Sequence, residues 1–78
     1  MKRLIGEIIQ DTQTLKSSQM EYSANQEFFV ALVSICEDLS VDIPFWTMRE
    51  DVALEKDKLV QIKLNANTVL KITTEKVG

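Results

Sequence analysis

Carboxylates are the most numerous side chains in this sequence that could do chemistry. Glu37, Asp38 and Asp42 lie close together near the end of an apolar stretch, and a second acidic group follows. Carboxylate oxygens are the ligands that a hard cation such as Mg²⁺ prefers. The spacing lacks the alternating Asp or Asn ligands and the central Gly of a calcium loop, and it is typical of solvated acidic side chains. We therefore expect no metal site and no cofactor. The second acidic group consists of Glu50, Asp51, Glu55 and Asp57.

Nucleophilic chemistry has little support. Cys36 is the one cysteine, and the chain has no histidine. A catalytic cysteine normally needs a histidine or another cationic neighbour to form its thiolate at neutral pH. Cys36 is thus expected to be a small buried apolar residue. The two glycines, Gly6 and Gly78, supply no phosphate-binding loop. We expect no enzyme, since only carboxylate, lysine, tyrosine or hydroxyl chemistry is left.

Aromatic and cationic residues gather after the one proline, Pro44. Phe45, Trp46 and Arg49 follow it in an expected loop, which makes them the candidate recognition residues. The competing interpretation is that Phe45 and Trp46 close the open end of a small core. Replacing Trp46 with Ala separates the two, because an unfolded variant favours the role in the core.

Composition and charge favour a folded intracellular domain. The chain is 45% hydrophobic and 27% charged, with a net charge of -3 and no long run of Lys or Arg, so we expect no nucleic-acid partner. Glu7 and Asp11 interrupt the first apolar stretch too early for a signal peptide. The run 28–36 is broken by Ser34 and is much shorter than the roughly 20 residues of a membrane span. We expect a cytoplasmic protein without membrane contact.

The first third of the chain is predicted to form a β-hairpin. Residues 3–10 carry β-favouring Leu and Ile, and Gly6 lowers the helix preference further. A polar break at 11–13 precedes a second expected strand over 14–22, which is rich in Thr, Ser, Gln and Tyr. A helix over 4–15 is the alternative, because neither strand has a clean period of two.

A long helix is predicted in the middle of the chain. Ser23 and Gln26 have the spacing of a capping box, which places the helix start there. Two adjacent apolar stripes then span roughly 200° of the helix, against about 100° for an ordinary amphipathic helix. We therefore expect the helix to lie between its own sheet and a second surface, either the following loop or another copy of the protein. The first stripe consists of Phe28, Leu32, Ile35 and Leu39, and the second of Phe29, Val33 and Cys36.

The last part of the chain is predicted to add a hairpin, with a short helix before it. Thr47 and Glu50 repeat the capping-box spacing ahead of a possible helix over 48–56. Apolar and polar residues then alternate over 60–64 and 70–73, on either side of an Asn-rich turn. The predicted fold is α+β, ββαββ, with antiparallel hairpins packed on one long helix.

Small size shapes the functional expectation. We expect residues 1–78 to form a single domain, with no disulfide because there is one cysteine. Oligomerisation is then the available source of extra stability. We expect a small self-associating structural or protein-binding module, a homodimer whose interface includes Phe29, Val33 and Cys36. The alternative is a small-molecule or metal-binding domain with its site near the acidic and Trp-containing loop.

Overall fold

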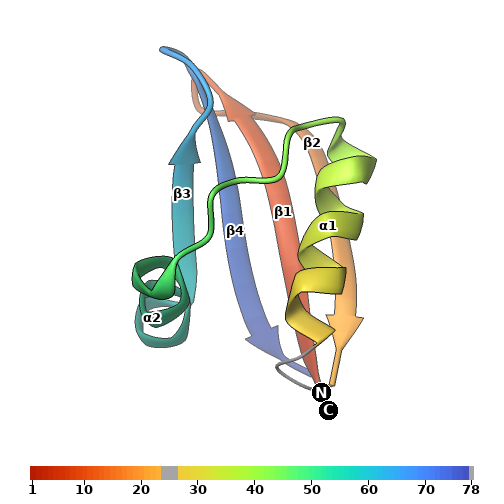
Figure 1. Ribbon diagram of the computed structural model, residues 1–78. Helices are drawn as coiled ribbons and strands as arrows, with labels where there is room; N and C mark the ends of the chain where they lie inside the picture. Colours follow the sequence, from red (N-terminus) through yellow and green to blue (C-terminus); the bar gives the residue numbers. More distant parts are fainter. Residues whose placement is uncertain (24–26, 78) are drawn as a thin grey trace.

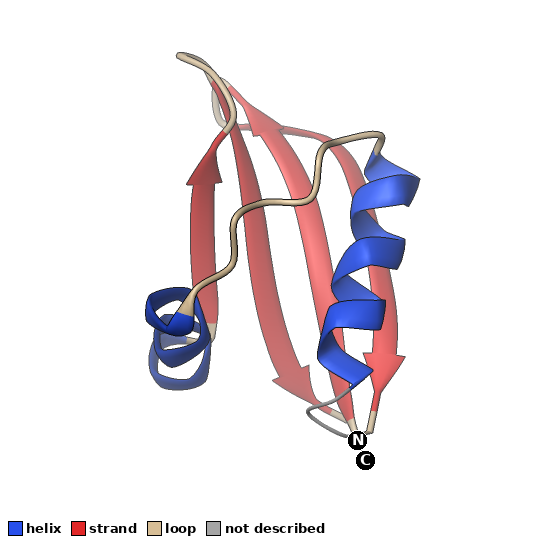
Figure 2. Ribbon diagram, viewed as in Figure 1, coloured by secondary structure: helices blue, strands red, loops and turns tan. Residues whose placement is uncertain are grey.

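The computed structural model describes residues 1–23 and 27–77. It contains four antiparallel strands in one sheet, in the order β2-β1-β4-β3, and two helices that lie over the same face of that sheet (Figure 1 and Figure 2). The predicted α+β class and ββαββ order are confirmed, including the extra short helix before the last hairpin. The elements are β1 (Lys2–Gln10), β2 (Gln13–Tyr22), α1 (Phe28–Leu39), α2 (Met48–Asp57), β3 (Leu59–Lys63) and β4 (Thr68–Lys76).

The first hairpin forms as predicted, and the alternative helix over 4–15 is wrong. Asp11 and Thr12 link β1 to β2, and both have positive φ angles, 49° and 69°. Positive φ at both central residues suits a two-residue hairpin turn, because its twist matches that of the strands. The pairing shifts between Ile8 and Ile9, which face Lys16 and Thr14, so one residue of β2 is left over as a bulge.

The two hairpins join through the strands nearest the chain ends. β1 pairs antiparallel with β4, with Gly6 opposite Ile72. These two strands are central in the sheet, and they supply Leu4, Leu70 and Ile72, which have no exposed surface. The sequence of β1 does not alternate between apolar and polar residues, but its burial does. Every second residue from Leu4 to Ile8 is buried beneath the helices.

Helix α1 packs its first apolar stripe on β1 and β2. Phe28, Leu32, Ile35 and Leu39 are all buried, as predicted. The helix begins at Phe28 with Glu27 as its N-cap residue, which makes no side-chain capping hydrogen bond. The Ser23 hydroxyl donates to the Glu27 carboxylate instead, at 2.7 Å. The expected return contact from Gln26 lies outside the described residues.

The second surface against α1 is the following loop. Residues 40–47 cross the helix-covered face of the sheet between α1 and α2 (Figure 1). Val41 and Trp46 of this segment pack against the core, and Cys36 is fully buried. Of the two predicted surfaces, the loop is therefore the one that the structure shows beside α1.

Helix α2 starts as the sequence predicted. The Thr47 hydroxyl accepts from the Arg49 N–H at 3.2 Å, and the Glu50 carboxylate accepts from the Thr47 N–H at 2.8 Å. Both halves of the capping box are thus present. Leu54 anchors the helix on the core. Among residues 1–23 and 27–77, no helix is long and apolar enough to cross a membrane.

Candidate functional site

The structure separates the two aromatic residues predicted for recognition. Trp46 is partly buried, with its ring centroid 5.2 Å from that of Phe28, and its Nε1 donates to Asp51 Oδ1 at 2.7 Å. Phe45 is 91% exposed, so it does not close the core. Arg49 is exposed on the first turn of α2. Trp46 forms its hydrogen bond with Asp51, so it is not joined to Arg49 in one cluster. Trp46 thus packs against the core and Phe45 is exposed, whereas recognition by these residues stays a prediction.

The three predicted interface residues also differ in their surroundings. Phe29 is 52% exposed, and Val33 is partly buried. Cys36 has no exposed surface, and its burial raises the pKa of the thiol. The expected buried role of Cys36 is confirmed, but the same burial prevents it from contacting a second molecule. Phe29 and Val33 are the accessible members of the predicted interface, which stays a prediction.

Exposed apolar side chains gather in the helical layer. Phe45 and Met48 are the most exposed of them, at 91% and 80%. The segments that carry them, α1, α2 and the loop between the helices, all lie on one face of the sheet (Figure 2). Large exposed apolar patches are typical of interaction sites. We call the following set the apolar helix surface: Phe29, Val30, Ile43, Phe45, Met48 and Val52.

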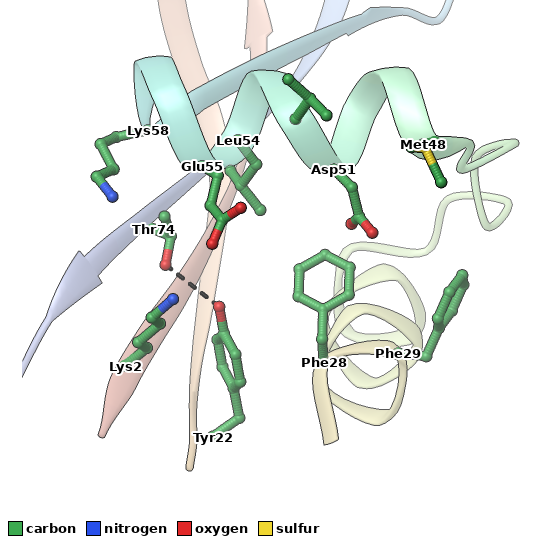
Figure 3. Close-up of a pocket in the computed structure, with 11 residues that line it drawn as sticks. Lys2, Tyr22, Phe28, Phe29, Met48, Asp51, Leu54, Glu55, Lys58 and Thr74 are labelled. Atoms are coloured by element: carbon green, nitrogen blue, oxygen red, sulfur yellow. Dashed lines mark hydrogen bonds between the residues drawn. The ribbon is translucent and has the colours of Figure 1, made fainter. Parts of the chain in front are cut away.

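A groove of about 350 Å³ lies between the start of α1 and α2, above the sheet. Figure 3 shows its two unlike ends. Phe28, Phe29 and Met48 lie at the more apolar end, together with Asp51. Tyr22 and Thr74 lie at the polar end, together with Glu55, and their hydroxyl oxygens are 3.4 Å apart. The groove can therefore accommodate a molecule that is apolar at one end and polar at the other.

Lysines surround the polar end. Lys2 pairs with Tyr22 on β2 and with Lys76 on β4. Lys58 follows α2, and its carbonyl accepts from the Thr74 N–H at 3.3 Å. All three lysines line a second hollow of about 610 Å³ that shares Lys2, Tyr22, Lys58 and Thr74 with the groove. Sequence reasoning missed this site, because its members are brought together by strand pairing and have no local spacing signal.

No family model, curated protein or solved structure matches this chain.

The acidic residues make structural contacts. Asp38 accepts from the Ser18 hydroxyl at 2.8 Å, and Asp51 accepts from Trp46. The hydrogen bond from the Thr47 N–H holds the pKa of Glu50 below its usual value. Within the described ranges 1–23 and 27–77, no group of three or more Asp, Glu, Cys or His side chains is placed to hold a metal ion.

Proposed function

We propose that this protein is a self-associating binding module that forms a homodimer through the apolar helix surface. The observation that carries the proposal is the exposure of Phe45, at 91%, and Met48, at 80%. Both side chains lie in the segment that leads into α2, where a capping box and a hydrogen bond from Trp46 hold the backbone in place. Large apolar side chains on a fixed backbone are suited to docking, because little conformational entropy is lost on binding.

The expected affinity follows from the size of these side chains. Burying one large apolar side chain contributes about 1.5–3 kcal/mol, so Phe45 and Met48 from two copies contribute about 6–12 kcal/mol in all. Association costs an estimated 4–15 kcal/mol in lost translational and rotational freedom. These two residues alone therefore give a weak dimer at best. Phe29 and Val52, which flank the same groove, add the remaining contact area.

A second copy of the chain is a suitable partner for this surface. In a two-fold dimer each patch meets the same patch on the other subunit, so the surface must be compatible with itself. An apolar patch meets this condition, since it brings no like charges together. The net charge of -3 per chain opposes association. Salt at near-physiological ionic strength largely screens this repulsion between charges more than about 8–10 Å apart.

Sedimentation velocity and native mass spectrometry of the full chain, from micromolar to near-millimolar concentration, test the proposal. The wild type should shift from monomer to dimer as concentration rises. The double variant Phe45→Ser/Met48→Ser should remain monomeric with an unchanged circular dichroism spectrum. Leu15→Ser is the matched control, because Leu15 is 53% exposed on β2 and lies outside the apolar helix surface.

The partly buried Val33 tests how far the interface extends along α1. Val33→Glu should dissociate the dimer, because Val33 lies one turn after Phe29 on the same side of α1. A wild type that stays monomeric at every concentration would reject self-association. A dimer that survives in Phe45→Ser/Met48→Ser would reject this surface as its interface.

A further inference from the structure

Three lysines converge at one end of the sheet in a chain whose net charge is -3. Lys2 and Lys76 are direct partners in the β1–β4 pairing. Like charges directly opposite each other in an antiparallel pair are destabilising. Lys58 adds a third positive charge from the end of α2. An anion at this position would relieve the repulsion among the three ammonium groups.

Of the three acidic residues that line the groove and the hollow, Glu75 and Asp51 have other partners. Glu75 is next to Lys76 in sequence, but its carboxylate is bound by Arg3, with Nη1 and Oε1 2.6 Å apart. Arg3 also lies 3.5 Å from Glu21. Asp51 lines the groove, and its Oδ1 accepts from Trp46. Glu55 is the remaining acidic residue that lines the groove, and its carboxylate lies at the polar end, on the same side as Lys2 and Thr74 (Figure 3).

The groove continues from Lys2 and Lys58 along the space between the start of α1 and α2, where Asp51 lies among apolar side chains. Phe28, which is 8% exposed, and Leu54, which is 5% exposed, contribute to its inner wall, and Met48 lies at its outer rim (Figure 3). The volume of about 350 Å³ is near the lower limit of the roughly 300–1,000 Å³ found for small-molecule sites. A groove of this volume accommodates one short flexible chain.

We propose that this groove binds a single-chain anionic amphiphile, namely a medium-chain fatty acid. Lys2 and Lys76 attract the carboxylate, and the Tyr22 hydroxyl donates a hydrogen bond to it. The alkyl chain lies against Phe28 and Met48. The alternative from the sequence was a small-molecule site near the Trp-containing loop. Our proposal places that site in the groove beside the loop. This inference goes beyond self-association, and the groove shares Phe29, Met48 and Val52 with the apolar helix surface, so decanoate is titrated at a concentration at which the chain is monomeric.

Trp46 provides a built-in reporter of binding. It is the one tryptophan in the chain, and its ring contacts Phe28, which lines the groove. Decanoate, kept below its micellar concentration, is titrated into the full-length protein and followed by Trp46 fluorescence and by calorimetry. The expected result is saturable binding of one decanoate per chain. Decanol, which has the same chain length without the charge, should bind at least several-fold more weakly.

Charge variants separate this site from general attraction. Lys2→Gln or Lys76→Gln should each raise the Kd for decanoate about threefold, and the pair about tenfold, since partly screened charges act weakly. Lys63→Gln is the matched control, because it removes the same charge near the opposite end of the sheet and should leave the Kd unchanged. Glu55→Gln should lower the Kd, because it removes the remaining negative charge beside the carboxylate.

Several outcomes would overturn the proposal. Non-saturable binding of decanoate, or decanol binding as tightly as decanoate, would show that the lysines recognise no head group. A Kd that is the same in Lys2→Gln/Lys76→Gln and in the wild type would reject the anion site. Binding to vesicles that contain phosphatidylglycerol, without binding of free decanoate, would assign the lysines to a membrane surface instead. The fluorescence of Trp46 and the circular dichroism spectrum without ligand establish that each variant is folded.

Discussion

Replacing Gly6 with alanine should push α1 away from the sheet. Gly6 lies on the helix-covered face of β1, and a Cβ at this position would overlap Ile35 Cγ2 and lie 3.2 Å from Leu39 Cδ1. Ile35 is 1% exposed, and its β-branched side chain has one strongly preferred χ1 rotamer in a helix. The Ile35 methyl group therefore cannot rotate away, and the helix itself must move.

The expected loss of stability is the balance of two effects. Overpacking a well-packed core costs about 1–3 kcal/mol. Alanine also lowers the conformational entropy of the unfolded chain, which offsets about 0.4–1 kcal/mol. The difference spans about 0–2.6 kcal/mol, and because the contact is with a stiff β-branched side chain we expect a fall of about 1–2 kcal/mol in the free energy of unfolding. For a domain of this size, Tm shifts by about 4–8 °C per kcal/mol, so Tm should fall by about 4–16 °C.

Urea and thermal unfolding, followed by far-ultraviolet circular dichroism, measure this change. Ser17→Ala on the exposed part of β2 is the control, and it should be close to neutral. In the double variant Gly6→Ala/Ile35→Leu the loss should be smaller than the sum of the two single losses, because leucine has no methyl group on its Cβ. A Gly6→Ala variant as stable as the wild type would refute the close contact between α1 and β1.

Three further predictions concern the core and the start of α2. Cys36 should resist a thiol reagent in the folded protein and react fully in denaturant, because burial both shields the thiol and raises its pKa; rapid stoichiometric labelling of the folded chain would contradict this. Trp46→Ala should lower the free energy of unfolding by about 1–3 kcal/mol in urea titrations, less than the roughly 3–5 kcal/mol expected for a fully buried tryptophan. Trp46→Phe should lower it by less than Trp46→Ala, because it keeps an aromatic ring against Phe28. An NMR titration should give a pKa for Glu50 below 4.5, since the Thr47 N–H stabilises the ionised carboxylate. The contribution of this contact to stability is present above pH 4.5 and is lost as the pH falls through the folded pKa. Glu50→Gln should remove that pH dependence.

Local patterns were sufficient to predict most elements of the fold. The alternation over 60–64 and 70–73 predicted the last hairpin, and the spacing of Thr47 and Glu50 predicted the start of α2. The start of α1 was less well predicted, because the structure begins that helix at Phe28 and uses Ser23 for a side-chain contact. Helix caps depend on a few backbone angles, so one change in the preceding segment moves them.

The candidate sites were predicted only in part. The sequence indicated Phe45 as a contact residue, and the structure leaves it exposed. It also grouped Trp46 with Phe45 and Cys36 with Phe29, although each pair divides between core and surface. The spacing of residues in a helix predicts the side of the helix on which a side chain lies. It does not predict whether another segment, here residues 40–47, covers that side chain.

The sequence by itself determined the number, type and order of the elements, because hydrophobic period, capping residues and turn residues act over a few positions. Only the tertiary structure decided that β1 and β4 are neighbours in the centre of the sheet, since that pairing joins segments from opposite ends of the chain. The same pairing sets Lys2 opposite Lys76 and closes the groove beside Tyr22. A site built from such distant residues leaves no local pattern, because the contacts that create it exist only after the sheet has formed.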